Sequence, residues 1–209
     1  MKEYEGEITS IDDLNKVSGL AKGSIREKIE EFIKTGEIEQ VKLITEDSKI
    51  IENLSNIYGV GPSKANELLK KHKITSINDL KQKIENDDSI LNDKQKIGLK
   101  HYDDLLKKIP RTEMDKHNNF ITNFIKTIDK KNDLKYEIVG SYRRKANKSG
   151  DIDVLCTTKN KDTKLFNEII EKLENDKYIT DTLAKGDKKF MGVSKLHRHK
   201  RHRRLDMIY

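Results

Sequence analysis

The sequence contains a single cysteine, two prolines and no tryptophan among its 209 residues. Because Cys156 has no second cysteine to pair with, no disulfide can form within the chain, which indicates a reducing compartment. No run of about eighteen apolar residues is present, and residues 1–10 are acidic rather than signal-like. These absences exclude a disulfide scaffold and a helical membrane span. They predict a soluble intracellular protein, of the nucleus or the cytoplasm, without a membrane partner.

The chain also has few apolar residues and many charged ones. Hydrophobic residues make up 33% and charged residues 38%, so any core is small, but regularly spaced Ile, Leu, Val and Phe argue against disorder. The net charge of +7 is unevenly placed, because residues 1–110 sum to −2 and residues 111–209 to +9. A basic half indicates a polyanion such as nucleic acid or a nucleotide. A solvated, lysine-rich surface is the alternative explanation.

Apolar spacing predicts helices throughout the first half. Ile25, Ile29, Phe32 and Ile33 share one helical face, and Gly36 supplies a stop. A further helix is expected to begin at Pro62, where proline suits the first turn, and others are expected over residues 77–84 and 99–106. Pro110 interrupts the pattern and marks the expected domain boundary.

The second half mixes two periodicities. Helices are expected over residues 120–128 and 165–173, and strands over residues 136–139, 152–157, 190–196 and 203–209, with a basic turn over residues 195–202. Helix, strands and one inserted helix predict a small mixed β-sheet covered on one side. The fold class is therefore α+β, with an all-α N-terminal half.

A weak internal repeat lies in the helical half. The segments VSGLAKGSI and IYGVGPSKA begin forty residues apart, at Val17 and Ile57, and each resembles a helix–hairpin–helix. In that motif, glycines let the backbone approach a phosphate, and amides at the next helix start donate to it. An ordinary turn between packed helices is the alternative, and it is stronger for the first copy, which has Ala21 where a second glycine is expected.

The segment GSYRRKANKSGDIDV, residues 140–154, is the most informative in the chain. Residues i and i+2 of a strand share a face, so Asp151 and Asp153 present adjacent carboxylates that a divalent cation would stabilise. Asp206, in RRLDMIY, has similar apolar flanks and is expected on a neighbouring strand. Three carboxylates can hold two metals about 3.5–4 Å apart, the geometry of phosphoryl or nucleotidyl transfer.

The same segment offers phosphate ligands. Gly140 and Ser141 follow a predicted strand and open a short helix, and Arg143 and Arg144 follow one turn later. Backbone amides, a hydroxyl and guanidinium groups are suited to non-bridging phosphate oxygens. An Asp-x-Asp pair alone is usually a surface feature, but its combination with Gly-Ser and Arg-Arg is specific.

Long and nearly collinear segments resemble family X DNA polymerases of the DNA polymerase beta type. The likeness runs from about Val17 to Tyr209 and is carried by EKIEEFIKTG, GVGPSKA, KQKIGLKHYDDLLKKIPRTEM, GSYRRKANKSGDIDVL, ITDTLAKGDKKFMGV and HRRLD. It implies a partial lyase-like helical segment with the first hairpin over residues 1–46. It further implies a helical DNA-binding subdomain over residues 47–110 and a nucleotidyltransferase palm over residues 111–209.

The resemblance also implies roles in a polymerase that adds a dNTP to a primer 3′-end during short-gap DNA repair. Asp151 and Asp153 would hold two Mg²⁺ ions, and Asp206 would hold the catalytic ion and help deprotonate the primer hydroxyl. Arg204 would order Asp206 and the primer end, and Lys189 would lie near the template. The residues implied in contacts with the triphosphate are Arg111, Ser141, Arg144 and Gly150.

In the hairpins, the resemblance implies backbone contacts. Carbonyls of Ser55, Ile57 and Val60 would hold Na⁺ or K⁺, with a looser counterpart at Asn15, Val17 and Leu20. The primer phosphate would be gripped along residues 59–64, through Gly59, Gly61, Ser63 and Lys64. Lys28 matches the Schiff-base lysine of the family's lyase. Neighbouring Glu27, Glu30 and Glu31 favour a protonated surface lysine there instead.

Several alternatives stay open. The resemblance implies that part of the lyase domain and the C-terminal, nucleotide-selecting subdomain are lacking, so a catalytically impaired monomer that binds gapped or nicked DNA is the second reading. A nucleotidyltransferase acting on a protein or small molecule is a third, which the hairpins disfavour. His197, His199 and His202 suggest a zinc site, but five Lys or Arg lie from Lys195 to Arg203, which favours a basic loop near DNA.

Overall fold

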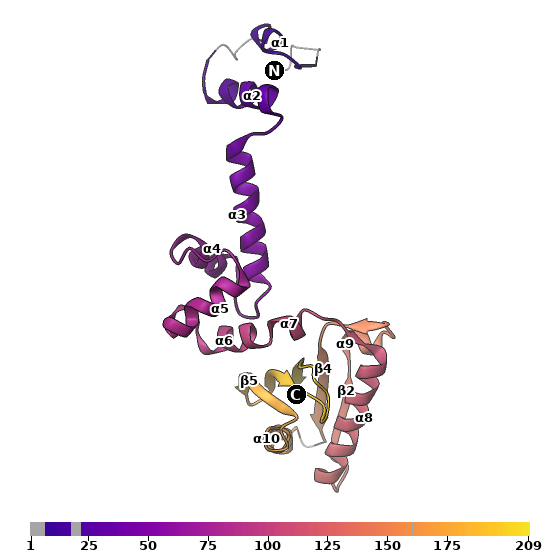
Figure 1. Cartoon of the computed structure of the whole chain (residues 1–209). Helices are drawn as coiled ribbons and strands as arrows, with labels where there is room; N and C mark the ends of the chain where they lie inside the picture. The colour runs from indigo at the N-terminus through magenta and orange to yellow at the C-terminus, as the bar shows by residue number, and fades with distance from the viewer. Residues whose placement is uncertain (1–6, 18–21, 160) are drawn as a thin grey trace. The chain divides into compact units, whose positions relative to one another are not determined.

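The computed structural model of the chain describes residues 7–17, 22–159 and 161–209 (Figure 1). The chain divides into two compact units. The first contains residues 1–55 and 61–80, and the second contains residues 56–60 and 81–209. None of the described helices is long and apolar enough to cross a bilayer.

The first unit is helical, as the apolar spacing predicts. Its helices are α1 (Ile11–Asn15), α2 (Ser24–Thr35), α3 (Glu39–Ser55), α4 (Pro62–Lys70) and the start of α5 (Ile77–Asn86). Gly36 ends α2 in the left-handed region, and Pro62 opens α4, both as expected. Helix α3 was not predicted; it packs on α4, where Leu54 and Leu68 are fully buried.

Helices also open the second unit. After the short 3₁₀ helix Asp88–Ile90 come α6 (Asp93–Lys100) and α7 (Tyr102–Leu105). Asn92 and Gln95 form a capping box at the start of α6. The prediction of a single helix over residues 99–106 is wrong, because the helix breaks at His101. The Nε2 of this buried ring lies 2.8 Å from a carboxylate oxygen of Asp181.

A five-stranded mixed sheet forms the rest of the second unit. Its strands are β2 (Leu134–Ile138), β4 (Ile152–Thr158), β5 (Ile179–Gly186), β6 (Lys189–Ser194) and β7 (Arg203–Ile208), in the order β2-β4-β7-β6-β5. Only β4 and β7 run parallel. A small ladder pairs β1 (Ile109–Pro110) with β3 (Lys148–Ser149). Strand β5 was missed because two register shifts interrupt its period of two.

Two helices cover one face of this sheet. Buried residues of α8 (Arg111–Ile128) and α10 (Lys164–Asn175) share one core cluster with Ile152 and Val154 of β4 and Leu205 and Met207 of β7. Side chains alternate along a strand, so Asp153, Leu155 and Asp206 lie on the opposite face. Leu155 is 50% exposed, which shows that this second face is open. The prediction of an α+β fold with a sheet covered on one side is confirmed.

Candidate metal and phosphate site

Three aspartates meet on the open face of the sheet. Strands β4 and β7 lie side by side and place Asp153 directly opposite Asp206. Asp151 immediately precedes β4. One carboxylate oxygen from each of the three lies within 4.8 Å of the others. The structure therefore brings together the three carboxylates that the sequence singled out.

Electrostatics make this cluster suited to a cation. Burial raises the pKa of Asp206, and burial together with the charge of Asp151 raises the pKa of Asp153. The Asp206 side chain is only 12% exposed. Its buried Oδ1 has no hydrogen-bond partner among the described residues. An orphaned carboxylate oxygen within an all-oxygen donor set fits a hard divalent cation such as Mg²⁺.

Arg204 bridges two members of the cluster. Its Nη2 donates to Oδ2 of Asp151 and, at 3.2 Å, to Oδ2 of Asp206. The guanidinium carbon also lies 5.8 Å from the centre of the Tyr58 ring. Burial and the charge of Asp206 raise the pKa of that tyrosine, against the opposing charge of Arg204. Arg204 therefore lies beside Asp206, and its role at the primer end stays a prediction. Sequence reasoning missed Tyr58.

A short helix packs closely against Asp153. The Val139 N–H donates to the Asp153 carbonyl at 2.8 Å, and α9 (Gly140–Arg143) begins at the next residue. Gly140 has a φ of +60°, and a Cβ there would lie 2.2 Å from Oδ2 of Asp153. Glycine is therefore required for two reasons, the left-handed backbone and the space that the carboxylate occupies.

Three of the four expected phosphate ligands lie in this helix, directly after it or in contact with it. Ser141 lies within α9, Arg144 follows it, and Gly150 directly precedes Asp151. The charge of Arg144 acts to lower the pKa of Asp153, against burial and Asp151. Arg111 instead holds the end of α9: its Nη1 donates to the Tyr142 carbonyl at 3.1 Å, and its guanidinium lies 4.6 Å from that ring's centre.

Lys189 begins β6, beside β7. It is exposed and pairs in register with Ile208. Its charge makes a small contribution that lowers the pKa of Asp206, against the larger effect of burial. Lys189 is therefore near the carboxylates but not in contact with them, which suits a longer-range role toward a bound polyanion.

A buried ion pair behind the site was not found from the sequence. Arg203 is 1% exposed, and its Nε and Nη2 donate to the two oxygens of Glu113 at 2.7 and 2.8 Å. Its Nη1 donates to the Lys107 carbonyl at 2.8 Å. Burial acts to raise the pKa of Glu113, but the hydrogen bonds and charge of Arg203 outweigh it and lower that pKa. The pair fixes β7, and hence Arg204 and Asp206, against α8.

The second hairpin has the backbone features of a phosphate loop. Gly59 has a φ of +82°, and the Ile57 carbonyl accepts the Val60 N–H at 2.9 Å. Gly61 is the N-cap of α4, whose first turn contains Ser63 and Lys64. Ser55 ends α3, and its buried Oγ has no partner among the described residues. The Na⁺ or K⁺ site stays a prediction.

The first hairpin is described only in part. The Asn15 Oδ1 accepts from Nη2 of Arg26 at 2.7 Å, and Val17 is buried. Leu20 lies outside the described residues. Lys28 is exposed on α2.

The three histidines of the basic turn do not converge. His197 Nε2 lies 2.8 Å from Asp176, and His202 Nδ1 lies 3.2 Å from Asp104. Within residues 7–17, 22–159 and 161–209, the one group of three or more His, Cys, Asp or Glu that can hold a metal is the aspartate cluster. The zinc alternative therefore has no support among these residues.

Comparisons with known proteins agree with this geometry. Residues 108–209 match the family described as DNA polymerase beta palm, and residues 52–106 match the fingers domain of DNA polymerase lambda. The chain is similar to DNA polymerase lambda of Rattus norvegicus, with 27% identity over 216 residues that cover all of this chain and 36% of the relative. It is similar to DNA polymerase lambda of Arabidopsis thaliana, with 31% identity over 161 residues that cover 75% of this chain and 28% of the relative.

The chain thus spans about a third of the length of these relatives. The palm and fingers matches follow one another along the chain, and the palm match contains all three aspartates of the site. They identify residues 52–209 as a family X DNA polymerase sequence, as the motifs predicted.

Proposed function

We propose that the chain adds a dNTP to a primer 3′-end in short-gap DNA repair synthesis, because it contains palm and fingers sequences of a family X DNA polymerase. The observation that carries this proposal is the cluster of Asp151, Asp153 and Asp206 on the open face of the palm sheet. Beside it lies an amide-rich helix start at Gly140, suited to a triphosphate. The chain would work in the nucleus or the cytoplasm.

Each residue then has a defined task. When bound, two Mg²⁺ ions would supply charge stabilisation for the attacking and leaving oxygens. Asp151 and Asp153 would hold both ions, and Asp206 would hold the catalytic ion and accept the proton of the primer hydroxyl. Arg204 restrains two of these carboxylates through its Nη2. Phosphate oxygens would be held by Arg111, Ser141, Arg144 and Gly150.

DNA would be held mainly by backbone groups and dispersed charge. The amides over residues 59–64 would contact the primer phosphate, aided by Na⁺ or K⁺ on the carbonyls of Ser55, Ile57 and Val60. Lys189 would lie near the template strand. The excess of positive charge in residues 111–209 supports DNA as the partner. The chain would act as a monomer.

Single-nucleotide incorporation on DNA with a one-nucleotide gap tests this function. We expect Mg²⁺-dependent extension by the purified chain, loss of extension in EDTA, and loss in Asp153→Asn. The matched control is Asp187→Asn, which changes an exposed aspartate in the β5–β6 turn. Extension by Asp153→Asn equal to that of the unmodified chain would overturn the proposal.

Binding of gapped or nicked DNA without turnover is the second candidate. It is favoured by the second hairpin, whose glycine geometry needs no chemistry at the aspartates. Under this reading, the chain binds gapped DNA more tightly than intact duplex, with affinity that falls as salt rises, and no extension is detected. Equal affinity for the two DNAs would exclude it.

A further inference from the structure

Strand β2 is a free edge of the palm sheet. It ends the strand order and pairs only with β4. The Val139 N–H donates to the Asp153 carbonyl, which shows which of the facing residue pairs of β2 and β4 are the hydrogen-bonded ones. Because such pairs alternate along an antiparallel ladder, Lys135 and Glu137 bond to β4, while the backbone groups of Tyr136 and Ile138 point outward. Among the described residues, none bonds to these outward groups.

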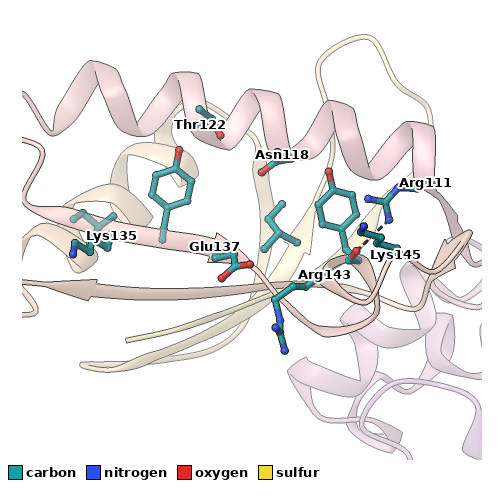
Figure 2. A pocket seen from close by; sticks show the side chains of 11 residues that line it. Arg111, Asn118, Thr122, Lys135, Glu137, Arg143 and Lys145 are labelled. Atoms are coloured by element: carbon teal, nitrogen blue, oxygen red, sulfur yellow. Dashed lines mark hydrogen bonds between the residues drawn. The ribbon is translucent and has the colours of Figure 1, made fainter.

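A groove follows this edge. Its volume is about 590 Å³, and all five residues of β2 line it. Helix α8 forms the other wall, from which Asn118 and Thr122 face the strand (Figure 2). A strand of five residues is about 16 Å long, so the groove follows the edge for the length of a short extended peptide.

The groove is basic. Arg111, Lys135, Arg143 and Lys145 line it, against the single carboxylate of Glu137. Lys135 lies on β2 toward one end of the groove, whereas Arg111, Arg143 and Lys145 lie on α8 and around α9 toward the other end (Figure 2). An acidic ligand is the complementary one.

We propose that this groove binds an extended acidic segment of a partner protein, which adds to β2 as a sixth strand. Edge strands bind peptides in this way, with backbone hydrogen bonds supplying affinity and flanking side chains supplying selectivity. Tyr136 and Ile138 offer both donors and acceptors. A nucleic acid backbone would match the lysines and arginines, but its phosphates only accept and would leave the outward carbonyls unpaired.

A second copy of the chain is a weaker occupant, because it would bring two sets of the same four cations together. The groove shares Arg111 with the proposed phosphate ligands, but none of the three aspartates lines it. Strand β4 lies between β2 and β7, and the carboxylates project from the open face of the sheet. Peptide binding therefore leaves the three aspartates accessible.

The test uses the whole 209-residue chain and a fluorescent heptapeptide in which Asp or Glu alternates with Val. A control peptide carries Pro in place of each Val, which keeps charge and length but removes strand pairing. We expect the Val peptide to bind at least about tenfold more tightly, and to shift the amide resonances of Tyr136 and Ile138. Equal binding of both peptides would show that only nonspecific charge attraction holds them, and would overturn the proposal.

Variants of the chain complete the test. Tyr136→Pro removes an outward N–H that the ladder to β4 does not use, together with a ring that packs against the core, and binding should fall at least about tenfold. Tyr136→Ala is the matched control, because it loses the same ring but keeps the N–H, and it should bind normally. If Tyr136→Pro does not fold, Lys135→Glu combined with Lys145→Glu replaces it, with the same expected loss. Unchanged binding in these variants contradicts the proposal. Two further results would contradict it. One is displacement of the peptide by oligothymidylate, with shifts of the amide resonances of β2. The other is a dimer of the chain that Tyr136→Pro abolishes.

Discussion

The two faces of the palm sheet show how neighbouring residues acquire opposite tasks. Arg203 and Arg204 are adjacent on β7, so their side chains leave the strand on opposite sides. Arg203 is buried on the covered face and bound by Glu113, whereas Arg204 is on the open face and holds two aspartates. Contacts on the covered face determine where β7 lies, and the open face presents carboxylates that can bind a cation. A change on one face should therefore alter stability, and a change on the other should alter activity.

The largest expected effect is on the open face. Asp206→Asn removes one ligand of the proposed metal pair, which should lower the rate of gap filling about a thousandfold, roughly 4 kcal/mol. Thermal melting should be unchanged or higher, because a buried carboxylate with a raised pKa is removed. Gap filling and melting of the same preparation check both results, and a strongly lowered melting temperature would contradict the division between the faces.

On the covered face, Arg203→Met leaves the Glu113 carboxylate buried without its partner. Breaking a buried ion pair in this way should lower the free energy of unfolding by about 3 kcal/mol or more. Arg204→Met is the matched variant, and because Arg204 is partly exposed its unfolding free energy should change by about 1 kcal/mol or less. Urea denaturation compares the two. Equal losses of unfolding free energy in the two variants would mean that the two arginines contribute equally to stability, which contradicts the difference in their contacts.

Gly140→Ala tests the contact between α9 and Asp153. Its Cβ would lie 2.2 Å from the carboxylate oxygen, so the carboxylate must move. A displacement of this size should lower the rate of gap filling about a hundredfold. Gly186→Ala is the control, since its Cβ would meet only the Lys189 carbonyl at 3.8 Å. If the Gly140→Ala variant were as active as this control, the close contact of α9 with Asp153 would not matter for activity.

The smallest effect is a pH dependence on the covered face. Because the pKa of Glu113 is lowered below 4.5 in the folded chain, its ion pair contributes fully above that pH. The contribution is lost as the pH falls from 4.5 through the folded pKa, since the unfolded chain then binds more protons. Glu113→Gln should flatten this part of the stability–pH curve. A slope equal to that of the unmodified chain would show that other groups cause it.

Much of the site could be predicted from the sequence because its chemistry repeats a short pattern. The period of two placed Asp151 and Asp153 together, and similar apolar flanks placed Asp206 on the next strand. Arg203 could not be found in this way. Its burial depends on Glu113, 90 residues away in the chain, and no local pattern distinguishes it from Arg204. Strand β5 was missed for a related reason, because its irregular register hides the alternation.

The most direct test of the aspartate site is Mn²⁺ titration of the isotope-labelled chain, followed by NMR. Mn²⁺ is a paramagnetic replacement for Mg²⁺ and takes the same oxygen ligands. We expect selective broadening at Asp151, Asp153 and Asp206 and at the neighbouring Gly140, with little broadening in Asp153→Asn. Broadening centred on His197 to His202, or unchanged in Asp153→Asn, would contradict the assignment of the metal to the open face of the sheet.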